Sequence, residues 1–146
     1  MATMTDERIR IGGIEVRFLL EGEQTAGALA MFEFGVEAGT KVPAPHSHDA
    51  YDETIYGLEG VLTWNVDGDL HDVGPGEVVA IPRGVVHGFD NTADVDARAL
   101  AVVTPGILGS AYFRDIAAVL ERAAGGPPDP AALAEVMRRH GLTPAR

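Results

Sequence analysis

The segment GTKVPAPHSHDAYDETIYGLEG runs from Gly39 to Gly60 and carries the strongest signal in the chain. His46 and His48 are two residues apart, so on a strand their side chains point to the same face, where two imidazoles can bind one cation. Glu53 follows a turn-like stretch, after which the next strand can bring its carboxylate back toward the histidine pair. The segment therefore predicts three ligands of a metal site.

A second segment, GEVVAIPRGVVHGFDN, runs from Gly76 to Asn91. It predicts a strand over 78–81, a turn, and a returning strand over 85–89 that carries His87, the two strands forming a hairpin. Three neutral imidazoles and one carboxylate suit one divalent transition metal ion (Fe, Mn, Ni, Co, Cu or Zn). Such a set leaves coordination positions open, as metal catalysis requires.

The sequence around these segments is typical of an all-β protein. Short runs rich in β-forming residues are separated by glycine and proline, a pattern that predicts a sandwich or barrel. Asp67-Gly68 between two such runs predicts a tight hairpin turn, because both residue types tolerate a positive φ. The clearest runs cover residues 28–36, 54–58, 61–66, 78–81 and 98–103.

The two segments resemble the two motifs of the cupin superfamily, and the chain resembles its quercetinase-like type-2 branch. The matching residues are Gly39, His46, His48, Glu53 and Gly60 in the first motif and Gly76, Pro82, Gly84, His87 and Asn91 in the second. The spacing departs from the family pattern only between Gly39 and His46, which is one residue longer than usual. The resemblance implies a jelly-roll β-barrel with a metal ion in its mouth, held by His46, His48, Glu53 and His87.

The pattern changes to helical after Gly109. Ser110 is expected to cap a helix that ends at Gly125-Gly126, and Asp129 followed by Pro130 predicts the start of a second helix that ends before Gly141. We therefore expect a cupin barrel over residues 1–108. A helical tail over 109–146 is expected to pack on the open side of the barrel or on a partner subunit.

Charge and composition exclude several classes of partner. The chain has 22 acidic and 11 basic residues, a formal net charge of −11. Residues 42–97 contain eleven acidic residues and only one basic residue, Arg83. This balance opposes binding to nucleic acid or to an anionic membrane surface. The chain has no cysteine, so a metal must be held by nitrogen and oxygen. No secretory signal is evident at the start, which predicts a cytoplasmic protein.

Aromatic residues near the expected ligands predict an apolar substrate pocket. We expect it to be lined by Phe32, Phe34, Tyr51, Trp64 and Phe89. Asp52 is expected to face solvent, because only Glu53 fits the ligand spacing. With Arg83 as the only nearby cation, phosphorylated substrates are disfavoured.

The leading functional hypothesis is a mononuclear metal dioxygenase or related oxidoreductase that acts on a small aromatic or enol-type substrate. Glu53 is the candidate catalytic residue, either as a ligand or as a proton acceptor. Two alternatives stay open: a non-catalytic binding or sensor protein for a small ligand, and a metal-dependent isomerase or lyase acting on a small keto acid. A homodimer is expected, with N-terminal strands near residues 9–20 pairing across a partner's sheet edge.

Overall fold

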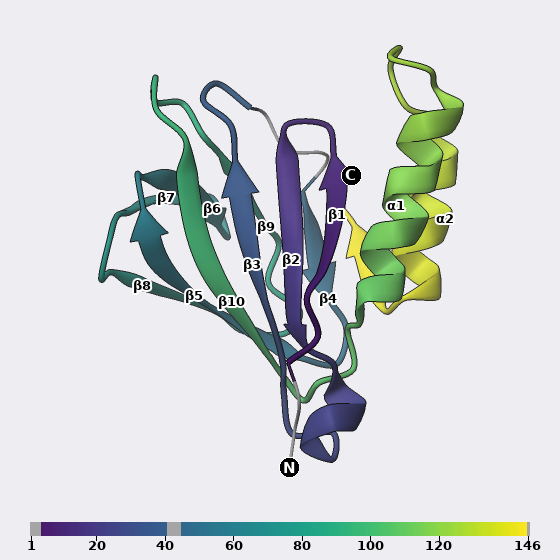
Figure 1. Ribbon diagram of the computed structural model, residues 1–146, viewed down its shortest axis with the longest axis horizontal. Coiled ribbons are helices and arrows are strands. Elements are labelled where there is room, and N and C mark those ends of the chain that lie inside the picture. Colours follow the sequence, from purple (N-terminus) through teal and green to yellow (C-terminus); the bar gives the residue numbers. More distant parts are fainter. Residues whose placement is uncertain (1–3, 41–44, 146) are drawn as a thin grey trace.

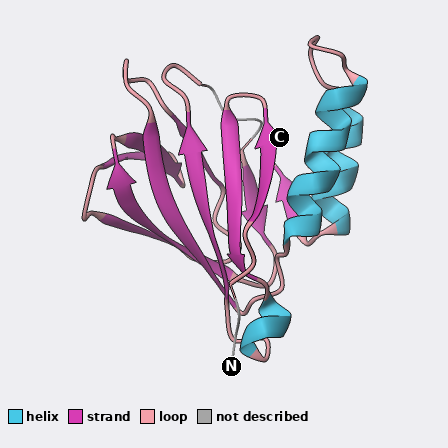
Figure 2. Ribbon diagram, in the orientation of Figure 1, coloured by secondary structure: helices cyan, strands magenta, loops and turns pink. Residues whose placement is uncertain are grey.

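The computed structural model describes residues 4–40 and 45–145, which fold mainly into short strands (Figures 1 and 2). The strands are β1 (Glu7–Ile11), β2 (Ile14–Leu20), β3 (Ala30–Val36), β4 (His46–His48), β5 (Asp52–Glu59), β6 (Leu62–Val66), β7 (Asp69–Val73), β8 (Val78–Ile81), β9 (His87–Asp90), β10 (Ala97–Thr104) and β11 (Leu142–Pro144). The helices are a short 3₁₀ helix (Gly22–Thr25), α1 (Ser110–Arg122) and α2 (Pro130–Arg139).

The strands form two antiparallel sheets. One has six strands in the order β1-β2-β3-β10-β5-β8, and the other has five in the order β11-β4-β9-β6-β7. The alternating buried and less buried residues of β3 and β10 pack one face of the six-stranded sheet inward. The predicted all-β jelly roll is confirmed, as a sandwich of two sheets and not as a closed barrel.

The structure explains the residue type at two positions of the motifs. Gly60 has a φ of +62°, and a Cβ atom there would lie 2.5 Å from the carbonyl oxygen of Asp96, so only glycine fits. Asn91 is 1% exposed, and its Nδ2 donates to the carbonyl oxygens of Val36 at 3.1 Å and Val95 at 2.9 Å. Gly60 therefore permits a close backbone approach, and Asn91 ties its loop to two other segments of the chain.

Of the two predicted hairpins, one is confirmed and one is wrong. Asp67 and Gly68 have φ values of +53° and +88° and join β6 to β7 as expected. The strand 78–81 does not pair with the strand that carries His87. Instead β8 pairs with β5 in the six-stranded sheet, and β9 pairs with β4 and β6 in the other. The chain crosses between the sheets at this turn, because both strands find longer-range partners.

Both C-terminal helices are present near their predicted limits. The Asp129 side chain accepts a hydrogen bond from the Ala131 N–H at 3.0 Å, with Pro130 as the first helical residue, as predicted. Ser110 does not cap α1. It is the first residue of the helix, and its N–H donates to Glu21 Oε1 at 2.8 Å, so a carboxylate distant in the sequence satisfies this helix end.

The helices lie side by side along one flank of the sandwich, beside β1 and β11 (Figure 1). Helix α1 buries Phe113 against the inward side of the six-stranded sheet, where its ring centroid lies 5.0 Å from that of Phe32. Strand β11, which the sequence did not predict, follows α2 and pairs with β4. The C-terminal segment is therefore part of the same core as the strands.

Candidate metal centre

Three histidines converge on the inner face of the five-stranded sheet. His46 and His48 both belong to β4, and His87 on the adjacent strand β9 is the register partner of His46. One side-chain nitrogen of each lies within 4.8 Å of the other two. The spacing of two residues on a strand and the pairing of neighbouring strands produce this cluster. These three residues can hold a metal ion.

The hydrogen bonding of His87 suits a metal ligand. Its Nδ1 lies 2.9 Å from the carbonyl oxygen of Val85, which can only accept, so Nδ1 carries the proton and Nε2 keeps its lone pair. A backbone carbonyl commonly orients metal-binding histidines in this way. The Nδ1 of His48 is buried without a hydrogen-bond partner among the described residues. The donor set and its surroundings fit a nitrogen-bound divalent ion.

Burial also keeps the cluster in the state that binds metal. Desolvation, followed by the charges of His87 and His46, lowers the pKa of His48 to about 2. Desolvation likewise lowers the pKa of His87. A buried imidazolium is costly, so both rings stay neutral at physiological pH. A metal ion would therefore face little competition from protons at these two residues.

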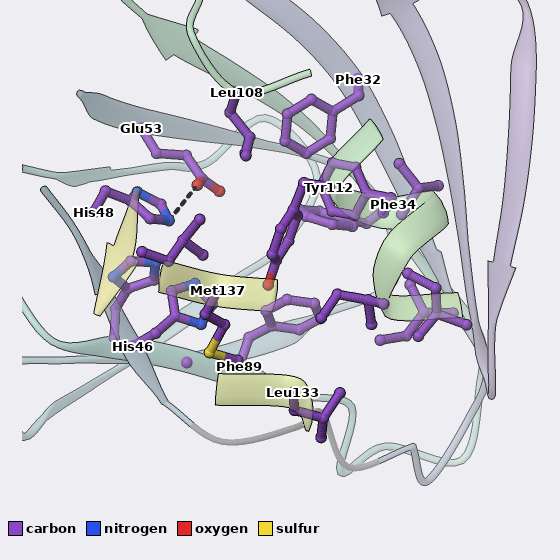
Figure 3. Close-up of a pocket in the computed structure, with 18 of the residues that line it drawn as sticks. Phe32, Phe34, His46, His48, Glu53, Phe89, Leu108, Tyr112, Leu133 and Met137 are labelled. Atoms are coloured by element: carbon purple, nitrogen blue, oxygen red, sulfur yellow. Dashed lines mark ion pairs between the residues drawn. The ribbon is translucent and has the colours of Figure 1, made fainter. Parts of the chain in front are cut away.

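Glu53 approaches the cluster from the opposite sheet. It lies on β5, is 5% exposed, and places Oε2 3.6 Å from His48 Nε2 (Figure 3). Burial raises its pKa to about 8. The short separation suggests an ion pair, but desolvation favours the uncharged form of both groups at neutral pH. Glu53 lies outside the group of three histidines, so the four-ligand set stays a prediction.

The cluster lies at one end of a cavity between the sheets and the helices (Figure 3). The cavity opens to solvent at its mouth and holds about 90 Å³ of space for the centres of water-sized molecules. Among the predicted pocket residues, Phe32, Phe34, Trp64 and Phe89 line this cavity. Tyr51 is not among the lining residues. It is fully buried and stacks on His48, with ring centroids 4.4 Å apart.

The charged neighbours of the site point away from the cavity. Asp52 faces outward as expected and accepts hydrogen bonds from Arg83, including a 3.1 Å contact with Nη2. Both side chains are about half exposed. No Lys or Arg of the described segments lines the cavity. The described part of the wall therefore offers no basic side chain to a phosphate group.

The C-terminal segment supplies part of the cavity wall, which the sequence did not predict. The residues involved are Leu108, Tyr112, Phe113, Ile116, Leu133, Met137 and Leu142. The apolar stripes of the two helices indicated packing, but a stripe does not distinguish a core contact from a cavity wall. Tyr112 is the one residue of this group with a polar side-chain group.

The sequence profile of the cupin domain matches residues 32–103. Together with the two-sheet jelly roll and the histidine cluster, this match identifies the chain as a member of the cupin superfamily. Within the described part of the chain, no helix is long and apolar enough to span a bilayer.

Three proteins that are similar to this chain have names that indicate no single activity. Protein SchB of Streptomyces halstedii is 37% identical over 92 residues, which cover 61% of this chain and 64% of that protein. The polyketide cyclase RemF from Streptomyces resistomycificus is 32% identical, with a TM-score of 0.56 over 64% of this chain and 66% of that one. A cupin-superfamily sugar phosphate isomerase from Silicibacter pomeroyi is 29% identical, with a TM-score of 0.55 over 64% and 60%. This chain spans less than two thirds of each relative's length.

Proposed function

We propose that this cupin is a metal-dependent enzyme that converts an enolisable aromatic polycarbonyl compound by closing a carbon ring. The observation that supports this proposal best is the contrast within the cavity: three histidines and a carboxyl group at one end, and apolar walls of aliphatic and aromatic side chains elsewhere, with no basic side chain among the described lining residues. The similarity to the polyketide cyclase RemF supports this substrate class. The lack of a basic side chain among the described lining residues argues against the sugar phosphates that the isomerase relative's name indicates.

His46, His48 and His87 would hold the ion in this proposal. When bound, a divalent ion would act as a Lewis acid toward carbonyl oxygens and favour the enol form. The aromatic walls, among them Trp64 and Phe89 with ring centroids 4.6 Å apart, would align the flat substrate and exclude water.

Glu53 would move the proton. Its raised pKa lies close to neutral pH, where a carboxyl group can both give and accept a proton efficiently. Ring closure would form a bond between an enol carbon and a distant carbonyl carbon of the same substrate. The oxygen of that second carbonyl would leave as water, so this reaction needs no oxidant.

A dioxygenase is the second candidate, and the same cavity supports it. An enolate is also the electron-rich species that reacts with O₂, and an apolar wall admits O₂ while limiting water. Here both atoms of O₂ would enter the product. The two candidates share substrate class and residues, and they differ in the mass of the product.

A mass-spectrometric assay tests these reactions together. The protein is loaded in turn with Fe, Mn, Co, Ni, Cu or Zn and incubated with an aryl polyketone, with and without O₂. Ring closure is expected to remove one water in both atmospheres. Addition of two oxygen atoms, only in air, would favour the dioxygenase, and an isomer of unchanged mass would favour the isomerase alternative. An unchanged substrate under every loading would contradict an enzymatic role and favour the binding or sensor alternative.

We also propose that the chain forms a homodimer. The N-terminal strands pair within one chain; β1 is an end strand, with α1 packed against it but no further strand beside it among the described residues. A second copy can cover that edge. Light scattering at micromolar concentration is expected to give twice the chain mass, and a monomer would refute the proposal.

A further inference from the structure

The cavity contains a polar group from outside the matched cupin region, the hydroxyl of Tyr112. Tyr112 is the third residue of α1, is 6% exposed, and lines the cavity. Figure 3 shows its oxygen directed into the space next to the histidines. Among the described residues that line the cavity, the other side chains are apolar, apart from the histidines, Glu53 and the indole of Trp64. The Tyr112 hydroxyl therefore adds a polar group to the histidine end of the cavity from a different part of the chain.

The Tyr112 hydroxyl is a hydrogen-bond donor. Desolvation, followed by the charge of Glu53, raises the pKa of this phenol, so it keeps its proton throughout the physiological range. A donor in an apolar wall gains most from a ligand that places an acceptor oxygen next to it. A ligand without that oxygen leaves the donor without a partner and binds more weakly.

Polar contacts fix the first turns of α1 and therefore the position of Tyr112. The Ser110 N–H donates to Glu21 Oε1 at 2.8 Å, and Arg114 Nη1 donates to Glu7 Oε1 at 2.6 Å. Asp115 Oδ2 lies 2.8 Å from His140 Nε2 and ties α1 to the end of α2. A group held by several such contacts is positioned before the ligand arrives, which favours specificity.

We propose that Tyr112 donates a hydrogen bond to a substrate oxygen other than those bound at the histidine cluster. It would thereby select polycarbonyl chains with a further carbonyl beyond the chelating pair. This assignment rests on the proposed function, since it takes the first two oxygens to be bound at the histidines. It makes the C-terminal helical segment a determinant of substrate length and oxygen pattern.

The test measures binding of two probes to the zinc-loaded protein. One is an aryl triketone, and the other is the aryl diketone of the same chain length. Trp64 is the only tryptophan of the chain and lines the cavity, so quenching of its fluorescence reports binding directly. The wild type is expected to bind the triketone about tenfold more tightly, the worth of one net hydrogen bond. Tyr112→Phe keeps the ring and is expected to remove this preference without weakening the binding of the diketone.

Tyr56→Phe is the matched control, because Tyr56 is 44% exposed and lies outside the cavity lining. It is expected to keep the wild-type preference, and an equal loss of preference in this variant would overturn the assignment. If Tyr112→Phe weakens both probes equally or changes neither, the assignment is wrong while the proposed substrate class stands. If the zinc-loaded wild type binds neither probe, the proposed function fails and the assignment fails with it.

Discussion

Residues 32–103 and residues 108–142 contribute to the same cavity in different ways. The cupin region supplies the three histidines and Glu53 from strands whose registers fix the direction of each side chain. The C-terminal region supplies helices and one short strand that bring apolar side chains and one hydroxyl. The strands place the histidines, the carboxyl group and part of the apolar wall, and the helices complete that wall and add one hydroxyl group.

The largest effect is expected from removing one of the proposed metal ligands. His87→Ala removes one of three donors and is expected to weaken metal binding by more than about 100-fold, since even losing an outer partner of a ligand costs 10- to 100-fold. The measurement is metal content after dialysis against a defined free-metal concentration. His71→Ala, an exposed residue on β7, is the control and is expected to keep its metal. Stoichiometric metal in His87→Ala would show that the ligands are misassigned.

The contribution of the C-terminal helices to packing can be tested at Phe113 in α1. This ring is 6% exposed and lies 5.0 Å from Phe32 and 6.1 Å from Phe18, centroid to centroid. Phe113→Ala is expected to lower the free energy of unfolding by about 3–5 kcal/mol, because it leaves a cavity in a packed aromatic cluster. Denaturant titration checks the value, with Ile107→Ala, 58% exposed, as a control expected to cost less than about 0.5 kcal/mol.

The same variant also tests whether the helices contribute to metal binding. Folded Phe113→Ala is expected to bind metal as the wild type does, since the histidines lie on the other sheet. Loss of metal together with stability would mean that the helices also hold the ligands in place. In that case the two regions would not contribute separately to metal binding and to the cavity wall.

The difference between local and long-range contacts explains which features could be predicted from the sequence. The pair His46 and His48, the Asp67-Gly68 turn and the Asp129-Pro130 helix start depend on local geometry, which a few neighbouring residues determine. The two-sheet jelly roll followed from the number and spacing of short strands and from the family resemblance. These parts of the structure agree with the predictions.

Features that depend on long-range contacts were not predictable in this way. The partners of β8 and β9 are chosen by strands far away in the sequence, so adjacency wrongly indicated a hairpin. Glu21 satisfies the start of α1 across 89 residues, which no local pattern reveals. Tyr51 was expected to line the pocket from its sequence position beside the ligands, but the chain direction before β5 directs its ring onto the back of His48.

The smallest predicted effect concerns Glu53, whose burial couples the site to the stability of the metal-free protein. Its pKa is about 8 when folded and 4.5 as an exposed group, so the folded state binds the extra proton between these values. Stability is then fully present below pH 4.5 and falls as pH rises toward 8, by at most about 1.4 kcal/mol per pH unit. His48 and His87 act in the opposite direction, because their lowered pKa values cost stability as pH falls through 6.5. The difference between the wild type and a variant without the carboxyl group, measured from pH 6.5 to 8, therefore isolates Glu53.

Denaturant titrations of the metal-free protein at pH 6.5 and 8 measure this effect. The wild type is expected to lose stability across the window, whereas Glu53→Gln, which has no proton to lose, is expected to gain slightly as the histidines of the unfolded chain lose their protons. Asp52→Asn is the matched control: Asp52 is the preceding residue on the same strand, but its pKa is lowered by hydrogen bonds from Arg83, so it titrates far below the window. It should follow the wild type. An equal slope in Glu53→Gln would mean that the carboxyl group is ionised throughout. In that case Glu53 would be a permanent anion beside the histidines, suited to bind the metal and unable to carry the proton in the proposed reaction.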